Sequence, residues 1–155
     1  MPKSLIENKK KQVVNPRYAK SGGYRKVIES IETEGKCPFC PENFLYHKKP
    51  ILKKKKNWFL TKDSWPYKNS KHHFLIIGTK HKEKFSQLTR EDFAEVSELA
   101  NWTIAKYKIQ GGAIAVRFGN TNFTGASVAH LHFHIITPEM KTKNSTKTVL
   151  FPIGG

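Results

Sequence analysis

Three histidines at every second position mark the part of this chain whose side chains could do chemistry. They are His130, His132 and His134. Successive side chains of a strand point to opposite faces, so we predict a strand over residues 128–136 with three imidazoles on one face. The alternate residues are expected to enter the core: Leu131, Phe133 and Ile135. Such a set of imidazoles suits a metal site, or covalent catalysis with one histidine as the nucleophile.

The segment before this predicted strand helps to choose between the two chemistries, and we predict a loop over residues 119–126. Residues 119–127 contain two glycines, two asparagines, two threonines and one serine. Glycines let a backbone approach a ligand closely, and amide and hydroxyl groups can hold a phosphoryl oxyanion. The segment offers no carboxylate ligand, so covalent phosphoryl chemistry is favoured over a catalytic metal centre.

Both cysteines of the chain stand together. Cys37 and Cys40 enclose Pro-Phe, and no other cysteine occurs in the sequence. In an intracellular protein this spacing is typical of a zinc site or a redox pair rather than of a structural disulfide. From the spacing alone, zinc binding, redox chemistry and two buried thiols all remain open.

The composition describes one ordinary domain with an unusual charge. The 155 residues carry a formal net charge of +16 and have a mean hydropathy of −0.58. Such a field attracts polyanions, so a nucleotide or nucleic-acid partner is plausible, although lysine-rich solvated faces also arise without one. No apolar run could span a bilayer, and the N-terminal residues lack the apolar region of a signal peptide. We therefore expect a cytoplasmic protein with no membrane partner.

Several elements must position these residues. The pattern predicts a helix over 21–34, a hairpin with strands at 51–52 and 58–61, and strands over 73–78, 113–118 and 149–151, the last of them short. Thr89 and Asp92 resemble a capping box, and the helical spacing of apolar residues behind it predicts a helix up to Tyr107. Short connections and one long helix predict an α+β fold with a mainly antiparallel sheet and a short N-terminal helix. Residues 1–20 form a basic, flexible segment in this prediction, and residues 21–155 form a single domain.

Three separate motifs, in this order along the chain, resemble those of one family. They are Cys-Pro-Phe-Cys at 37–40, His-Phe-Leu-Ile-Ile-Gly-Thr-Lys-His at 73–81, and the run from Gly125 to Ile136. Together they are similar to the histidine triad (HIT) nucleotide hydrolases and transferases, and the first is similar to the zinc half-site of many bacterial members. The resemblance covers roughly residues 37 to 138, and it implies a HIT-like fold.

The resemblance also implies roles for matching residues. His132 would attack an α-phosphorus and form a nucleotidyl-imidazole intermediate. His134 would donate to the α-phosphate oxygens, and the hydroxyl of Ser127 would lie near the leaving group. The implied nucleotide-binding residues are His73, Asn120, Asn122, Gly125, Ser127 and His134.

A metal site and an assembly follow from the same resemblance. The implied ligands of a structural Zn²⁺ are Cys37, Cys40, His81 and His130, a set that leaves no coordination position open. Family members usually pair as homodimers, so a homodimer is expected here.

The function that we expect is hydrolysis or transfer at an α-phosphate of a small nucleotide, in the class of adenylyl phosphoramidates or dinucleoside polyphosphates. One alternative uses the basic surface to deadenylate or decap nucleic-acid ends, which a steep salt dependence of oligonucleotide binding would indicate. A second alternative is a nucleotide-binding module without catalysis, which would be insensitive to replacement of His132.

Overall fold

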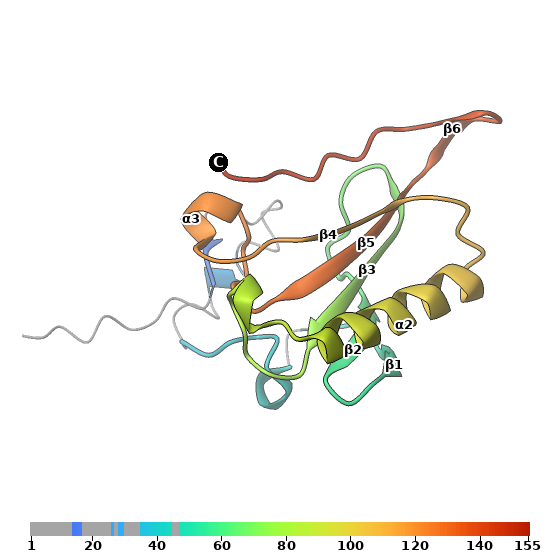
Figure 1. Ribbon diagram of the computed structural model, residues 1–155. Coiled ribbons are helices and arrows are strands. Elements are labelled where there is room, and N and C mark those ends of the chain that lie inside the picture. Colours follow the sequence, from blue (N-terminus) through green and yellow to red (C-terminus); the bar gives the residue numbers. More distant parts are fainter. Residues whose placement is uncertain (1–13, 17–25, 27, 30–34, 45–46) are drawn as a thin grey trace, which may run out of the picture.

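The computed structural model describes residues 14–16, 26, 28–29, 35–44 and 47–155. A five-stranded antiparallel sheet with strand order β1-β2-β3-β5-β4 forms its centre, and one long helix crosses one face of it (Figure 1). The main elements are β1 (Ile51–Lys54), β2 (Trp58–Lys62), β3 (Ser70–Gly78), α2 (Arg90–Lys106), β4 (Ala113–Val116) and β5 (His132–Pro138). The predicted α+β class and antiparallel sheet are therefore confirmed.

The N-terminal predictions can be compared with the structure only in part. The predicted helix over 21–34 and the basic segment 1–20 lie mostly outside the described residues. Within the part that is described, Val14 forms an antiparallel bridge with Val128, and the Asn15 N–H donates to the Ser127 carbonyl at 2.7 Å. None of the described helices is long and apolar enough to cross a membrane.

The two faces of the sheet are covered by different parts of the chain. On the face of α2, the core contains Trp58, Leu60, Phe74, Ile76, Val96, Leu99, Ala100, Leu131, Phe133 and Ile135. This confirms the prediction for the apolar residues between the histidines. On the opposite face, Phe39 and Phe44 pack against Phe59, Leu75 and Ile77. The histidines of β5 share this second face, because Leu75 pairs with His134 and Ile77 with His132.

The prediction of one regular ladder of three histidines is wrong, since β5 begins only at His132. The residue before it bonds to another segment: the Leu131 N–H donates to the Lys82 carbonyl at 2.7 Å, and its carbonyl accepts from Gly78 at 3.5 Å. The bond from Gly78 continues the β3–β5 pairing by one residue, and the bond to Lys82 then takes the chain out of the ladder. His130 therefore lies outside the strand, where its imidazole contacts both cysteines and is fully buried.

Two further predictions need correction. The segment over 119–126 is not wholly irregular, because it contains a short helix, α3 (Thr121–Thr124), whose N-cap is Asn120. The predicted strand at 149–151 does not form. A small hairpin of β6 (Met140–Thr142) and β7 (Ser145–Thr146) precedes it instead, and the remaining residues run back towards α3 without regular structure (Figure 1).

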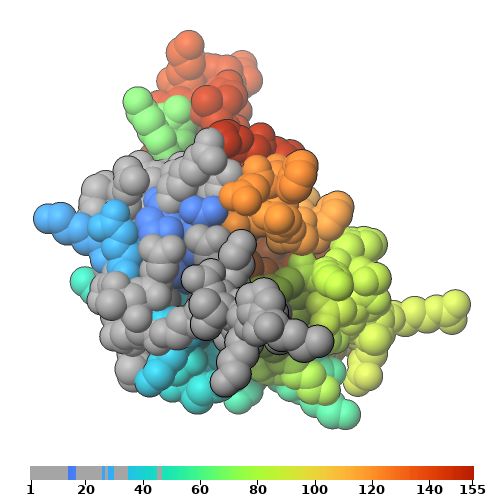
Figure 2. Space-filling view, turned by 90° about the vertical axis from the view of Figure 1, so that its left-hand side faces the viewer, coloured from blue at the N-terminus to red at the C-terminus, as the bar shows by residue number. Residues whose placement is uncertain are grey.

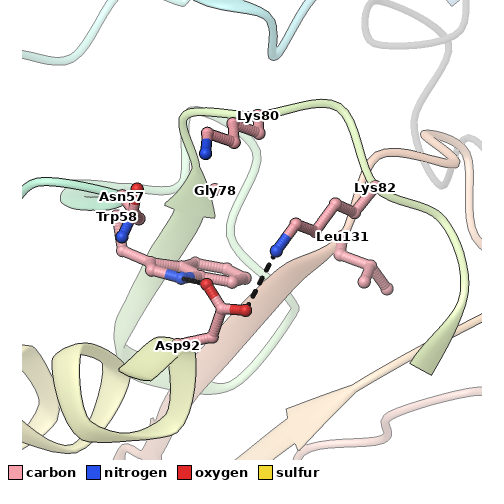
Figure 3. Close-up of a pocket in the computed structure, with 7 residues that line it drawn as sticks. All are labelled: Asn57, Trp58, Gly78, Lys80, Lys82, Asp92 and Leu131. Atoms are coloured by element: carbon pink, nitrogen blue, oxygen red, sulfur yellow. Dashed lines mark hydrogen bonds and ion pairs between the residues drawn. The ribbon is translucent and has the colours of Figure 1, made fainter. Parts of the chain in front are cut away.

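The start of α2 is fixed by one buried carboxylate. Thr89 and Asp92 form the predicted capping box, and the Asp92 carboxylate also accepts from the Trp58 indole N–H at 2.9 Å and from Lys82 at 3.0 Å (Figure 3). Burial raises the pKa of Asp92, but these hydrogen bonds outweigh it and lower the pKa to about 2. The stabilisation is present above the ordinary carboxyl pKa and is lost as the pH falls towards 2. The pocket of Figure 3 contains Leu131 but none of the histidines.

Replacing Asp92 with alanine is expected to destabilise the protein by about 2–4 kcal/mol, because the helix cap is lost and the buried Trp58 indole N–H is left unpaired. Urea unfolding would measure the change. Glu91→Ala is the matched control: Glu91 is exposed in the same helical turn, and its loss should cost only about 0.3–1 kcal/mol. Equal stability of the two variants would contradict the structural role of Asp92.

Candidate active site and metal-binding cluster

His132 has its imidazole fixed in one orientation by the backbone. Its Nδ1 lies 2.7 Å from the carbonyl oxygen of His130, so Nδ1 carries the proton and Nε2 keeps a free lone pair. The ring of Phe39 contacts it edge-on, with centroids 4.9 Å apart. Burial lowers the pKa of His132 to about 4, which keeps the imidazole neutral at pH 7. A neutral imidazole with a free Nε2 lone pair is the form that can act as a nucleophile.

His134 has the opposite arrangement of proton and lone pair. The Tyr67 N–H donates to His73 Nδ1 at 3.1 Å, so the proton of His73 must lie on Nε2. That Nε2 is 2.8 Å from His134 Nδ1, which therefore accepts the bond and leaves the His134 proton on Nε2. The Nε2–H of His134 is buried and has no partner among the described residues. Since a buried donor without a partner is costly, it marks a place where an acceptor should bind.

Asp63 lies beside this chain of bonds as a second, longer acceptor for the same N–H of His73, and reasoning from the sequence missed it. Its carboxylate lies 3.3 Å from His73 Nε2, and burial raises its pKa to about 6. Ligand atoms of Asp63, His73 and His134 lie within 4.8 Å of one another, as a metal site would require. To bind a metal, His73 would need its lone pair on Nε2 and therefore its proton on Nδ1. That Nδ1–H would then face the Tyr67 N–H, so two donors would oppose each other. The arrangement is therefore a set of hydrogen bonds centred on His73 rather than a metal site.

The second cluster contains both cysteines and two histidines, from three distant parts of the chain. Cys37 Sγ lies 3.4 Å from His130 Nδ1, and Cys40 Sγ lies 3.7 Å from the same atom and 3.5 Å from His81 Nδ1. A tetrahedral Zn²⁺ with ordinary Zn–S and Zn–N bonds places such S and N ligands about 3.5 Å apart. The four predicted ligands therefore converge with the spacing of one tetrahedral ion.

The proton positions in this cluster also fit a metal. His130 Nε2 lies 2.6 Å from the Gly78 carbonyl, and His81 Nε2 lies 3.2 Å from a Glu83 carboxylate oxygen. Both imidazoles therefore donate through Nε2 and direct the lone pair of Nδ1 at the sulfurs. Such outer hydrogen bonds are the usual support of a metal-binding histidine. The Nδ1 lone pair of His130 faces both sulfurs at similar distances. One lone pair can accept a hydrogen bond from only one thiol, whereas a metal ion between the three atoms would bind all of them.

The thiols themselves favour a bound cation. Burial is the main cause that raises the pKa of Cys37, to about 12, and burial also raises the pKa of Cys40. Without a cation, both side chains stay protonated at neutral pH. A bound divalent ion reverses this preference, because it stabilises the thiolates directly.

The loop residues implied by the resemblance lie at different depths. Gly125 is buried at the C-terminal end of α3 with a φ of 71°, and Ser127 is half-buried two residues further on. Asn120 and Asn122 are exposed, and the Asn120 side chain accepts from the Asn122 backbone N–H at 2.9 Å. The helix cap therefore already occupies one of the amide oxygens that could contact a ligand.

Reasoning from the sequence also missed three residues beside the histidines. The ring of Tyr67 lies 4.6 Å from that of His73 and 5.9 Å from that of His134. Phe151 contacts His134 at 5.1 Å, and Arg117 lies over the ring of Phe151 at 3.8 Å. No local pattern could have shown these contacts, since they join residues from remote parts of the chain.

The antiparallel fold, the neighbouring histidines His132 and His134, and the Cys/His cluster are the features to compare with known proteins. Residues 48–141 match the family model "HIT domain", so the chain belongs to the HIT domain family. A comparison with curated protein sequences finds no match.

Solved structures share the fold at low sequence identity. A HIT family hydrolase from Clostridium thermocellum is 22% identical with a TM-score of 0.56, over 71% of this chain and 97% of that one. A histidine triad nucleotide-binding protein from Candida albicans is 19% identical with a TM-score of 0.56, over 77% and 85%. A Zn-bound histidine triad protein from Mycobacterium smegmatis is 19% identical with a TM-score of 0.53, over 71% and 80%.

Proposed function

We propose that this protein is a nucleotide hydrolase or nucleotidyltransferase that works through a covalent intermediate on His132. The Nε2 lone pair attacks the α-phosphorus of a nucleotide, a P–N bond forms, and the bond to the leaving group breaks. Water or another acceptor then attacks the same phosphorus, the P–N bond breaks, and the acceptor loses its proton to solvent, which returns His132 to its neutral form. The leaving group takes a proton from solvent, for which the Ser127 hydroxyl is the candidate relay.

The observation that carries this proposal is the complementary state of the two neighbouring imidazoles. Their ring centroids are 4.8 Å apart. His132 offers a lone pair, and His134 offers a buried N–H without a partner. A phosphate between them would meet a nucleophile and a donor to its charged oxygens at the same time. Preorganised donors of this kind stabilise the charge that develops in phosphoryl transfer.

The substrates that we propose are small adenine nucleotides, either adenylyl phosphoramidates or dinucleoside polyphosphates. In this proposal, the backbone near Gly125 and Ser127 contacts the α-phosphate, while Asn120 or Asn122 contacts phosphate or ribose. His73 acts through His134, because it fixes the proton on that side chain.

The direct test is to trap the intermediate. The protein is mixed briefly with a panel of adenylyl phosphoramidates and diadenosine polyphosphates, then denatured and digested for mass spectrometry. An adenylyl group on the peptide that contains His132 is the expected result. Turnover without an adduct on any histidine, or binding of every substrate without turnover, would contradict the mechanism.

We also propose that Cys37, Cys40, His81 and His130 bind a structural Zn²⁺. All four positions of a tetrahedral ion are then filled, so the ion would add stability rather than catalysis. It would fix residues 37–40 against the chain just before β5. His132 follows His130 by two residues and also contacts Phe39, so the zinc site would support the position of the nucleophile.

A homodimer is the assembly that we propose, through the edge strand β4. The other edge, β1, ends in lysines, which protect an edge against pairing. Strand β4 has no charged residue, and its Ile114 is 51% exposed. Beside it lies an exposed aromatic cluster: Phe85, Phe93 and Phe118. An unprotected edge beside exposed aromatic rings fits a second copy of this chain.

Placing a lysine on this edge should dissociate the dimer. Ile114→Lys is expected to weaken dimerisation at least about tenfold, because the charge would be buried at the interface. Sedimentation velocity over a concentration series would measure it. Ile51→Lys on strand β1 is the matched control, since Ile51 is similarly exposed on the opposite edge. A monomeric wild-type protein, or dissociation by the control alone, would contradict this interface.

A further inference from the structure

The C-terminal residues lie against the proposed active site. In Figure 1 they run back from β6 towards α3, and Figure 2 shows them in red against the orange segment that includes α3. A Cβ added to Gly125 would lie 2.5 Å from the carbonyl oxygen of Gly154. Phe151 packs against His134 at 5.1 Å, the histidine whose Nε2–H has no partner. A ligand at this histidine would therefore meet the C-terminal segment.

Arg117 holds this segment in place. Its Nε and Nη2 both donate to the Pro152 carbonyl oxygen, at 3.0 Å and 2.6 Å. Nη2 also donates to the Tyr67 hydroxyl at 3.1 Å, and the guanidinium lies over the Phe151 ring at 3.8 Å. Every oxygen that it contacts is neutral, and it forms no ion pair with a carboxylate in the described part of the chain. Two adjacent N–H groups of an arginine are suited to an anionic oxygen.

The sheet places Arg117 on the side of the histidines. In the β4–β5 register, Ala115 pairs with His134 and Val116 pairs with Phe133. Arg117 follows the end of β4, and its side chain contacts Tyr67 and Phe151, which both pack against His134, so its guanidinium lies on the side of the histidines. If an α-phosphate lies between those histidines, the leaving group attached to it extends beyond them. The half-buried guanidinium of Arg117 is the neighbouring cation that could contact this leaving group.

We infer that Arg117 is a specificity-determining residue that binds a negatively charged leaving group, and that the Pro152 carbonyl oxygen occupies its place in the unliganded protein. This rests on the proposed function at His132. The substrate class is then a nucleotide whose α-phosphate is linked to a second anionic group, such as a phosphate, in preference to a neutral amine. An anion replaces the neutral carbonyl at the guanidinium and displaces the C-terminal segment.

The test compares two substrates, diadenosine tetraphosphate and an adenylyl phosphoramidate with a neutral amine leaving group. Arg117→Gln should lower kcat/KM for the first by roughly 10- to 100-fold, because a charge-assisted contact is lost. Turnover of the second should change less than about threefold. Arg117→Lys keeps the charge without the paired N–H groups, and an intermediate loss is expected. The matched control is Arg90→Gln, an exposed arginine at the start of α2.

The outcomes separate this inference from the proposed function. Equal losses for both substrates, or no loss for either, would overturn the role of Arg117 while an adenylyl adduct on His132 would still support the mechanism. A wild-type protein that cleaves only the phosphoramidate would also overturn it. Absence of the adduct with every substrate would instead count against the proposed function. Thermal unfolding of each variant checks the fold. If Arg117→Gln is unstable, Arg117→Lys replaces it in the comparison of the two substrates.

Discussion

Replacing His132 with asparagine is expected to reduce nucleotide turnover at least about 10⁴-fold, with no adenylyl adduct formed. Loss of a nucleophile removes the covalent route altogether, and effects of this order are seen when nucleophiles of other enzymes are removed. The amide can still donate to the His130 carbonyl, so the local backbone is expected to stay in place. Binding of a nonhydrolysable nucleotide should remain within about tenfold of wild type, because the Nε2 lone pair matters chiefly in the reaction.

Two further variants sharpen this prediction. His72→Asn is the matched control, because His72 stacks on Phe74 on the opposite face of the sheet. It should keep nearly full activity. His134→Asn removes a donor to the phosphate rather than the nucleophile, so a loss of about 10²–10³-fold in kcat is expected, with the adduct still detectable. A His132→Asn protein that keeps more than about 1% of wild-type turnover would contradict the assignment of the nucleophile.

The second large effect concerns the cysteine and histidine cluster. The purified protein should contain close to one zinc per chain. Cys40→Ser should abolish that stoichiometric zinc and lower the free energy of unfolding by about 3–5 kcal/mol, since binding a metal only in the folded state stabilises that state. Metal analysis and urea unfolding would measure both effects.

A thermodynamic cycle isolates the contribution of the metal. A strong chelator should destabilise the wild-type protein to about the level of Cys40→Ser, and should have little effect on that variant. Adding zinc back should restore only the wild type. Zinc-free protein with thiols that react readily in the native state would overturn the metal assignment, and would indicate the redox pair that the spacing alone left open.

Much of the architecture followed from local patterns. The capping box of Thr89 and Asp92 and the 3.6-residue periodicity behind it predicted α2, because both depend on residues within a few positions of each other. Alternation predicted that Leu131, Phe133 and Ile135 would be buried. The predicted strand at 149–151 does not form, because Phe151 packs half-buried on His134 while Leu150 stays exposed.

What the sequence by itself determined is the antiparallel α+β fold and the identity of the three histidines, since their spacing and neighbours are local properties. The tertiary structure decided the contacts and the proton positions by which the three imidazoles differ. The bond from the Leu131 N–H to the Lys82 carbonyl takes the chain out of the ladder before His132, and the imidazole of His130 contacts the cysteines there. The proton of His134 is fixed by remote residues, through His73. Such hydrogen bonds form only when distant strands pair, so no local pattern could have shown them.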